Sequence, residues 1–135
     1  MSWLKEICFP QNNNSEENMK HKISQNKLSR GSSQRKALLR NLVTDTIKHG
    51  KITTTKARAK AARPLVEKMI TIAKNKDFNS IRKVSEFILD KKVIDHLFDN
   101  VSVKFNERNG GYSRIVSLGT RQGDNAEIAI LELVD

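Results

Sequence analysis

The stretch KITTTKARAKAARPLVEKMITIA, residues 51–73, changes its hydrophobic period in the middle. Residues 51–55 are β-branched and alternating, which predicts a brief strand. Thr55 can then cap a helix from residue 56 to about residue 75, with one apolar stripe. The stripe consists of Leu65, Val66, Met69, Ile70 and Ala73. Pro64 interrupts this helix and predicts a kink or a break immediately before it.

A helix is expected on the N-terminal side of this strand, over residues 32–49. Ser32 or Ser33 can cap it, and Gly50 suits the position after its last turn. Its residues divide into an apolar face with Leu38, Leu39, Leu42, Val43 and Ile47, and a basic face with Arg35, Lys36 and Arg40.

Two more helices are expected after the helix that contains Pro64. One covers residues 80–89, with Asn79 or Ser80 as its cap, and the other begins after Asp90 and ends near Phe105. Their inward residues are Ile81, Val84, Phe87 and Ile88 in the first and Val93, Ile94, Leu97 and Phe98 in the second.

After Gly110 and Gly111 the hydrophobic period becomes two. One face of the expected strand holds Tyr112, Arg114, Val116 and Leu118, and the other holds Ser113, Ile115 and Ser117. Residues 119–125, GTRQGDN, form a loop, and residues 127–134, EIAILELV, are apolar on both faces, as in a central strand. The two strands are predicted to form an antiparallel hairpin.

These elements predict an α+β fold with about four helices packed on a small mixed β-sheet. The sheet combines the short strand after the first helix with the C-terminal hairpin, and residues 32–135 form a single globular domain. Residues 1–18 end in the polar run QNNNSEEN, which predicts a disordered leader that need not belong to the native chain. Residues 19–31 are expected to be a flexible basic arm that orders on a polyanion.

The positive charge is concentrated in one third of the chain. Residues 19–63 hold 13 lysines and arginines against the single acid Asp45, whereas the whole protein of 135 residues has a net charge of +10. Residues 1–18 carry −2, and residues 64–135 carry 11 bases and 11 acids. This asymmetry points to a polyanionic partner that is contacted mainly by residues 19–63.

The sequence argues against a disulfide, a metal site, a membrane span and a signal peptide. A single cysteine, Cys8, excludes an internal disulfide and a thiolate metal cluster, and the three histidines have no ligand spacing, so no metal or cofactor is expected. No apolar run approaches the roughly 18 residues of a membrane span. The opening MSWLKEICFP is too short and too interrupted for a signal peptide.

The sequence contains no clear catalytic motif. GTRQGD, residues 119–124, lacks the Lys and Ser/Thr of a phosphate-binding Walker loop and leads into a strand. Asp90, Asp95 and Asp99 alternate with lysines as on a solvated helix face. An enzyme acting on a small-molecule substrate is therefore not expected, and a small phosphate-handling enzyme is kept only as a third hypothesis.

Two basic clusters favour nucleic-acid binding. RGSSQRK, residues 30–36, combines cations with hydroxyl donors, a mixture suited to phosphates. Around the strand-to-helix turn after residue 52, Lys56, Lys60 and Arg63 follow one helical face, near backbone N–H groups that favour an anion. Solvated surface remains the simpler interpretation for any single one of these residues.

The chain resembles the bacterial-type large-subunit ribosomal protein seventeen family from about residue 19 to residue 135. The similar motifs are MKH at 19–21, LSR at 28–30, SSQR at 32–35, ITTTKARAKAAR at 52–63, NGGYSRI at 109–115, GDNA at 123–126 and LELVD at 131–135. The resemblance implies helices over a small mixed sheet, no catalytic activity, and binding to large-subunit ribosomal RNA. It also implies a place near the outer end of the polypeptide exit tunnel, beside neighbouring large-subunit ribosomal proteins.

The sequence departs from the family pattern at three places. Gln34 stands where a histidine is common, Pro64 falls inside the expected long helix, and residues 1–18 match nothing in the family. NGGYSRI is interpreted as a turn whose glycines permit positive φ, followed by Tyr112 for stacking on a base and Arg114 for a phosphate. Packing at the sheet edge is the alternative for Tyr112.

We therefore predict a noncatalytic ribosomal RNA-binding protein in the cytoplasmic ribosome, with an organellar ribosome as the alternative location. The alternative is a DNA-binding architectural protein of the nucleoid, because charge alone does not separate DNA from RNA. The predicted RNA-binding residues are Lys20, His21, Lys22, Lys27, Arg30, Ser32, Ser33, Arg35, Lys36, Arg40, Lys51, Thr53, Thr54, Lys56, Arg58, Lys60, Arg63, Arg108, Tyr112, Arg114 and Arg121.

Overall fold

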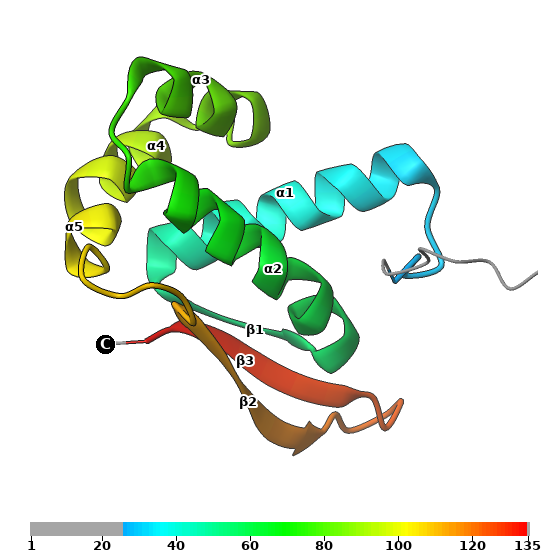
Figure 1. Ribbon diagram of the computed structural model, residues 1–135. Helices are drawn as coiled ribbons and strands as arrows, with labels where there is room; N and C mark the ends of the chain where they lie inside the picture. Colours follow the sequence, from blue (N-terminus) through cyan, green and yellow to red (C-terminus); the bar gives the residue numbers. More distant parts are fainter. Residues whose placement is uncertain (1–25, 135) are drawn as a thin grey trace, which may run out of the picture.

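The strand and the helix expected in residues 51–73 follow each other without a loop. In the computed structural model, which describes residues 26–134, β1 (Lys51–Thr55) passes directly into α2 (Lys56–Ala73) (Figure 1). α1 (Ser32–His49) precedes β1, and Gly50 between them has a φ of 75°, which only glycine adopts without strain from a Cβ. The predicted helix–strand–helix order is confirmed.

The N-terminus of α1 differs from the prediction. Gly31 occupies the N-cap position, and no side chain caps the helix. Ser32 and Ser33 already lie in the first turn, where the backbone is helical, so neither has the extended conformation of an N-cap residue. The prediction that one of these serines caps α1 is therefore wrong.

Pro64 does not break α2, which continues from Lys56 to Ala73. Proline removes the hydrogen bond to the carbonyl four residues earlier, here that of Lys60. Both Lys60 and Pro64 are exposed, so water can reach this side of the helix. On the opposite side, the buried Ala62 and Val66 hold the two halves of α2 against the core.

The next helix, α3 (Phe78–Phe87), starts two residues earlier than predicted, with Asp77 and not Asn79 or Ser80 at its N-cap position. Val84 and Ile88 are buried as expected. Ile81, which was expected to point inward, is 41% exposed, because the short α3 buries only part of its apolar face.

The fourth helix is confirmed, with an irregular middle. Asp90 caps α4 (Lys91–His96) by accepting a 3.1 Å hydrogen bond from the backbone N–H of Lys92. The helix then widens into one π-helical turn, η1 (Leu97–Val101), and ends as α5 (Ser102–Lys104), next to the predicted end at Phe105.

The sheet has the order β1–β3–β2, with β2 (Ser113–Thr120) and β3 (Glu127–Leu133) forming the expected hairpin. β3 is the central strand, as its apolar sequence predicted, and it pairs antiparallel with both neighbours. The expected description of the sheet as mixed is therefore wrong. β1 and β2 run in the same direction, but β3 lies between them, so no parallel pair forms.

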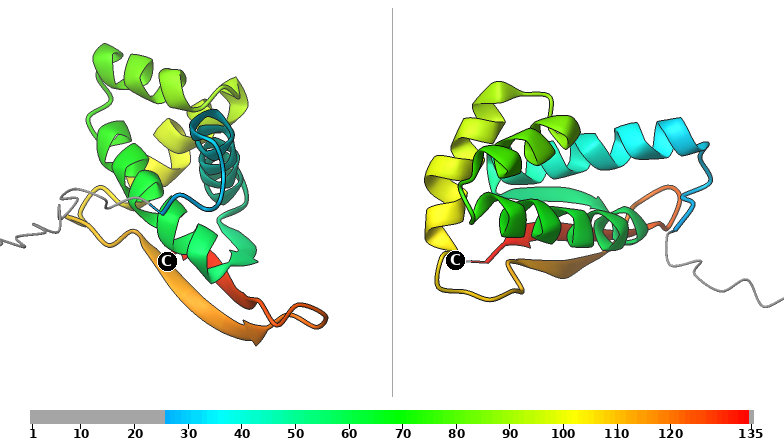
Figure 2. Two further views of the ribbon diagram at one scale, coloured as in Figure 1. Left: turned by 90° about the vertical axis from the view of Figure 1, so that its right-hand side faces the viewer. Right: turned by 45° about the horizontal axis from the view of Figure 1, so that its top comes forward.

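Helices cover one face of the sheet (Figures 1 and 2). α1 and α2 pack on each other and on the sheet, and α3 lies beyond α2. Residues from both layers form the core, including Val43, Ile47, Val66, Ile70, Leu97, Ala129 and Leu131. On the opposite face of the sheet Val116 and Leu118 are exposed, and a bulge between Ser117 and Gly119 shifts the register of β2. The predicted α+β class is confirmed.

Candidate nucleic-acid interface

The N-terminal end of α1 collects six of the predicted contact residues. Lys27, Arg30, Ser32, Ser33 and Lys36 are exposed, and Arg35 is half-buried. The first turn of α1 holds no acidic residue. Among the described residues, none of these four cations forms an ion pair with a carboxylate. Their charges are therefore available to an external anion.

A groove between α1 and α2 continues this basic surface. Its cavity of about 390 Å³ is lined by Arg35 and Leu39 from α1 and by Lys60, Pro64 and Lys68 from α2, among others. The groove thus combines cations with the apolar side chains of Leu39, Pro64 and Leu65. Lys68 was not predicted from the sequence, although the spacing of four between Lys60, Pro64 and Lys68 places all three on one side of the helix.

Next to the sheet, α2 brings together Lys56, Lys60 and Arg63, as their helical spacing predicted. These three cations line a recess of about 370 Å³ with Ile115, Ser117 and Ala129. Lys60 thereby borders both recesses. The Lys56 ammonium contacts the Glu127 carboxylate at 2.8 Å, and this hydrogen bond holds the pKa of Glu127 below its ordinary value. An internal carboxylate therefore already occupies part of the N-terminal end of α2.

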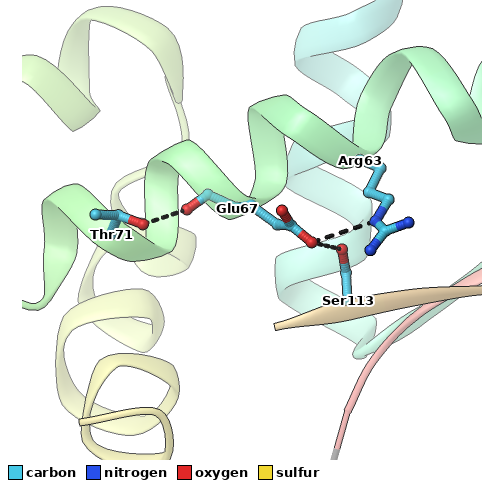
Figure 3. A network of polar contacts seen from close by, with 4 residues as sticks. All are labelled: Arg63, Glu67, Thr71 and Ser113. Carbon is cyan, nitrogen blue, oxygen red and sulfur yellow. Dashed lines mark hydrogen bonds and ion pairs between the residues drawn. The ribbon is translucent and has the colours of Figure 1, made fainter. Parts of the chain in front are cut away.

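Arg63 is held in place by a polar network that joins α2 to β2 (Figure 3). Glu67 Oε1 accepts hydrogen bonds from Arg63 Nε at 3.3 Å and from Ser113 Oγ at 3.1 Å. Thr71 Oγ1 donates to the backbone carbonyl of Glu67 at 2.9 Å. The bond to Glu67 uses Nε, which leaves the two terminal amino groups of Arg63 without a hydrogen-bond partner among the described residues.

The structure separates other residues that were grouped by sequence. Thr53 pairs with Ile130 and Thr54 with Ala129, so their side chains point to opposite faces of the sheet, and only that of Thr54 faces the helices. Arg40 is half-buried beside α3, with its guanidinium carbon 5.9 Å from the centre of the Phe87 ring. Its Nε is buried without a hydrogen-bond partner in the described part of the chain. Arg40 thus belongs partly to the packing of the helices.

The arginines of the hairpin already have acidic partners. Arg114 forms an ion pair with Glu132 across the strands. Arg121 donates two hydrogen bonds to Asp124, at 3.1 and 2.6 Å, and this contact lowers the pKa of Asp124 to about 2. A phosphate at either arginine would have to share the cation with a carboxylate or displace it.

Tyr112 is not available for stacking on a base, and this prediction is wrong. The side chain is 2% exposed, and its ring lies 5.3 Å from that of Phe105, between centroids. The hydroxyl donates a 3.2 Å hydrogen bond to the backbone carbonyl of Arg108. Tyr112 precedes β2, so the strand alternation that placed it beside Arg114 on the outer face does not extend to it. The Arg108 side chain is exposed near the turn.

The remaining predicted residues are spread over the molecule. Arg58 is half-buried in the first turns of α2, and Lys51 lies at the other end of β1 from this turn. Lys20, His21 and Lys22 lie outside the described residues, as does most of the predicted arm.

Residues 26–134 contain neither a candidate metal site nor a candidate membrane-spanning helix. Within that range, no three or more His, Cys, Asp and Glu side chains come together in a group that could hold a metal ion. No helix in the same range is both long and apolar enough to cross a membrane.

Comparison with known proteins agrees with the motifs in the sequence. The family model of ribosomal protein L17 matches residues 38–134. The chain is 56% identical over 108 residues to the large ribosomal subunit protein bL17 of Clostridium perfringens (strain SM101 / Type A), which covers 80% of this chain and 96% of that protein. The protein of the same name from Clostridium botulinum (strain Hall) is 54% identical over 108 residues, with the same coverage. Because the family model matches more than half of the chain and these relatives are aligned over nearly their whole length, the chain belongs to the ribosomal protein L17 family.

Proposed function

We propose that this protein, a large-subunit ribosomal protein by its family, binds large-subunit ribosomal RNA through one basic surface. We call it the α1–α2 surface and define it by Lys27, Arg30, Arg35, Lys36, Lys60 and Lys68. Its role is structural and noncatalytic, with contacts to neighbouring proteins of the subunit. Its expected location is the cytoplasmic ribosome.

The observation that carries this proposal is the absence of ion pairs, among the described residues, at the cations of the α1–α2 surface. None of its six cations is paired with a carboxylate among the described residues, whereas Lys56, Arg63, Arg114 and Arg121 all are. Unpaired cations on adjoining elements are suited to phosphates, because binding costs no broken ion pair. The groove between α1 and α2 adds apolar surface on which a sugar or a base can lie.

The other predicted residues have smaller roles in this proposal. Lys56 and Arg63 lie at the border of the surface and can contact phosphate with the donors that their carboxylates leave unused. Residues 19–31 supply further cations that would follow the RNA away from the folded domain. RNA is favoured over DNA by family membership, since the cations by themselves contact phosphates of either polymer.

Sedimentation of the native protein tests the proposal. A lysate is fractionated on a sucrose gradient in low salt, and the protein is detected across the gradient. We expect it in the large-subunit fractions, with ultraviolet crosslinks from peptides of the α1–α2 surface to ribosomal RNA. Protein that remains at the top of the gradient, or that is crosslinked to DNA, would refute the proposal.

A matched pair of variants makes the test specific. Arg35→Gln/Lys36→Gln removes two cations from the α1–α2 surface, and Lys83→Gln/Lys91→Gln removes two exposed cations from α3 and α4. Only the first variant is expected to leave the large-subunit fractions when the salt concentration rises. Equal salt sensitivity of both variants would show that total charge, and not this surface, controls association.

A further inference from the structure

A second basic recess lies at the opposite end of α1. Its cavity of about 510 Å³ is lined by the last residues of α1, the start of β1, and the helix formed by α4, η1 and α5. The polar side chains of this lysine–histidine recess include Lys48, His49, Lys51, His96, Asn100 and Lys104. We propose that it binds the phosphodiester backbone of a second RNA segment, separate from the one at the α1–α2 surface.

The charges of the recess favour an anion. Lys48 and Lys51 contribute two ammonium groups, and Glu132 is the only carboxylate among the described residues that line the recess. Glu132 already forms an ion pair with Arg114 across the strands. Lys48 and Lys51 have no carboxylate partner in residues 26–134. A phosphate entering the recess would therefore meet a net positive field.

The recess also presents directional donors. Asn100 Nδ2 lies 2.9 Å from His96 Nδ1, and an amide nitrogen can only donate, so Nδ1 is the acceptor. The other ring nitrogen, Nε2, is then the one that can donate to a phosphate oxygen. The amide thus fixes the tautomer of the ring.

The π-helical turn explains how one helix supplies so many of these groups. In η1 the backbone N–H of Ser102 bonds to the carbonyl of Leu97, five residues earlier. This wider turn keeps residues on one side of the helix at spacings of four and five, so His96, Asn100, Val101, Lys104 and Phe105 all line the recess. Turns of this kind occur frequently at functional sites.

The inference rests on the proposed RNA-binding function, and the position of the recess indicates what a second phosphate site would do. α1 has 18 residues and therefore separates the two basic regions by about 27 Å. At this separation the two regions can contact different RNA segments at once. A rigid helix with a phosphate site at each end would fix the distance between these segments in the assembled subunit.

Hydroxyl-radical footprinting of ribosomal RNA in reconstituted large subunits tests this inference. With the wild-type protein we expect two groups of protected nucleotides that are separate in the RNA sequence. Lys48→Gln/Lys51→Gln should remove the protection of one group, and Arg35→Gln/Lys36→Gln that of the other. The Lys83→Gln/Lys91→Gln protein, with the same change of charge, should protect both groups as the wild type does.

Several outcomes would overturn the inference and leave the main proposal intact. The Lys48→Gln/Lys51→Gln protein could protect every nucleotide normally, or it could weaken both groups equally, and either result rejects a separate second site. If that variant loses crosslinks to an acidic protein neighbour and keeps its RNA protections, the recess binds protein. Lys48→Arg/Lys51→Arg should restore protection, which separates loss of charge from misfolding. Failure of the proposed function itself would appear earlier, as wild-type protein absent from the subunit.

Discussion

At the scale of single residues, Tyr112 joins the turn before β2 to the helical layer. Its ring packs on Phe105, and its hydroxyl donates to the carbonyl of Arg108. We expect Tyr112→Phe to lower the free energy of unfolding by about 0.5–1.5 kcal/mol through the lost hydrogen bond. Tyr112→Ala should lower it by about 3–5 kcal/mol, because a buried ring is removed. Urea denaturation followed by circular dichroism measures both values.

RNA binding separates this structural role from the stacking role that the sequence suggested. Under conditions where it is folded, the Tyr112→Phe protein should bind ribosomal RNA with the affinity of the wild type. A Tyr112→Phe protein of normal stability and weaker RNA affinity would show that the hydroxyl reaches the RNA after all.

The pair Arg121–Asp124 gives a prediction about pH. The arginine lowers the pKa of Asp124 from 3.8 to about 2, mainly through its hydrogen bonds. Because the carboxyl group is more acidic in the folded protein than in the unfolded one, the pair stabilises the fold above about pH 4. This contribution is lost as the pH falls from about 4 to about 2. Both groups are exposed, so the effect on stability should be small.

Titration by NMR detects the effect directly. The side-chain carboxyl carbon of Asp124 should titrate near pH 2 in the wild type and closer to its ordinary range in Arg121→Gln. An Asp124 that titrates at the same pH in both proteins would show that the ion pair does not persist in solution.

At the scale of elements, Pro64 weakens α2 without breaking it. Replacing it with alanine restores a backbone donor for the carbonyl of Lys60 and should raise the free energy of unfolding by about 1–3 kcal/mol. The gain is limited because proline also restricts the unfolded chain. Thermal unfolding measures the change, with Ser85→Ala in the exposed part of α3 as a control. A less stable Pro64→Ala protein would mean that the proline ring packs in the α1–α2 groove more tightly than its exposure suggests.

The elements differ in how far the sequence could predict them. α1, β1, α2 and β2 carry a period of 3.6 or 2, β3 is a continuous apolar run, and each was expected close to its observed bounds. The position of β1 beside β3, which makes the sheet wholly antiparallel, depends on how the helices pack and leaves no local signal. The π-helical turn and the exposure of Ile81 also depend on tertiary contacts, because apolar spacing cannot show which neighbours are present.

At the scale of the whole molecule, the block of charge in residues 19–63 predicted where cations gather but not which of them are paired. Lys56 meets Glu127, and Arg114 meets Glu132, through contacts between residues that are distant in the sequence. Because of these contacts, fewer cations can bind a phosphate without first giving up a carboxylate partner. Lys68, from the electrically balanced part of the chain, belongs to the α1–α2 surface because it lines the groove between the helices, and Tyr112 does not because its side chain is buried.

The last prediction follows from this division into paired and unpaired cations. Each phosphate contact contributes about 0.7–0.9 to the slope of log affinity against log salt concentration. Replacing the unpaired Arg35, Lys36 and Lys60 with glutamine should therefore lower the slope by about 2–3. The same replacement at the exposed Lys83, Lys91 and Lys92 should change it by less than about one.

Filter binding to a ribosomal RNA fragment, over a range of potassium chloride concentrations, measures these slopes. A third variant, Arg114→Gln/Arg121→Gln, tests the pairing itself, because it removes two cations that already have acidic partners. Its slope should fall by less than that of Arg35→Gln/Lys36→Gln, although both variants lose two charges. If the two slopes fall equally, the ion pairs of the hairpin open on binding, and the RNA surface extends from the N-terminal end of α1 across β2.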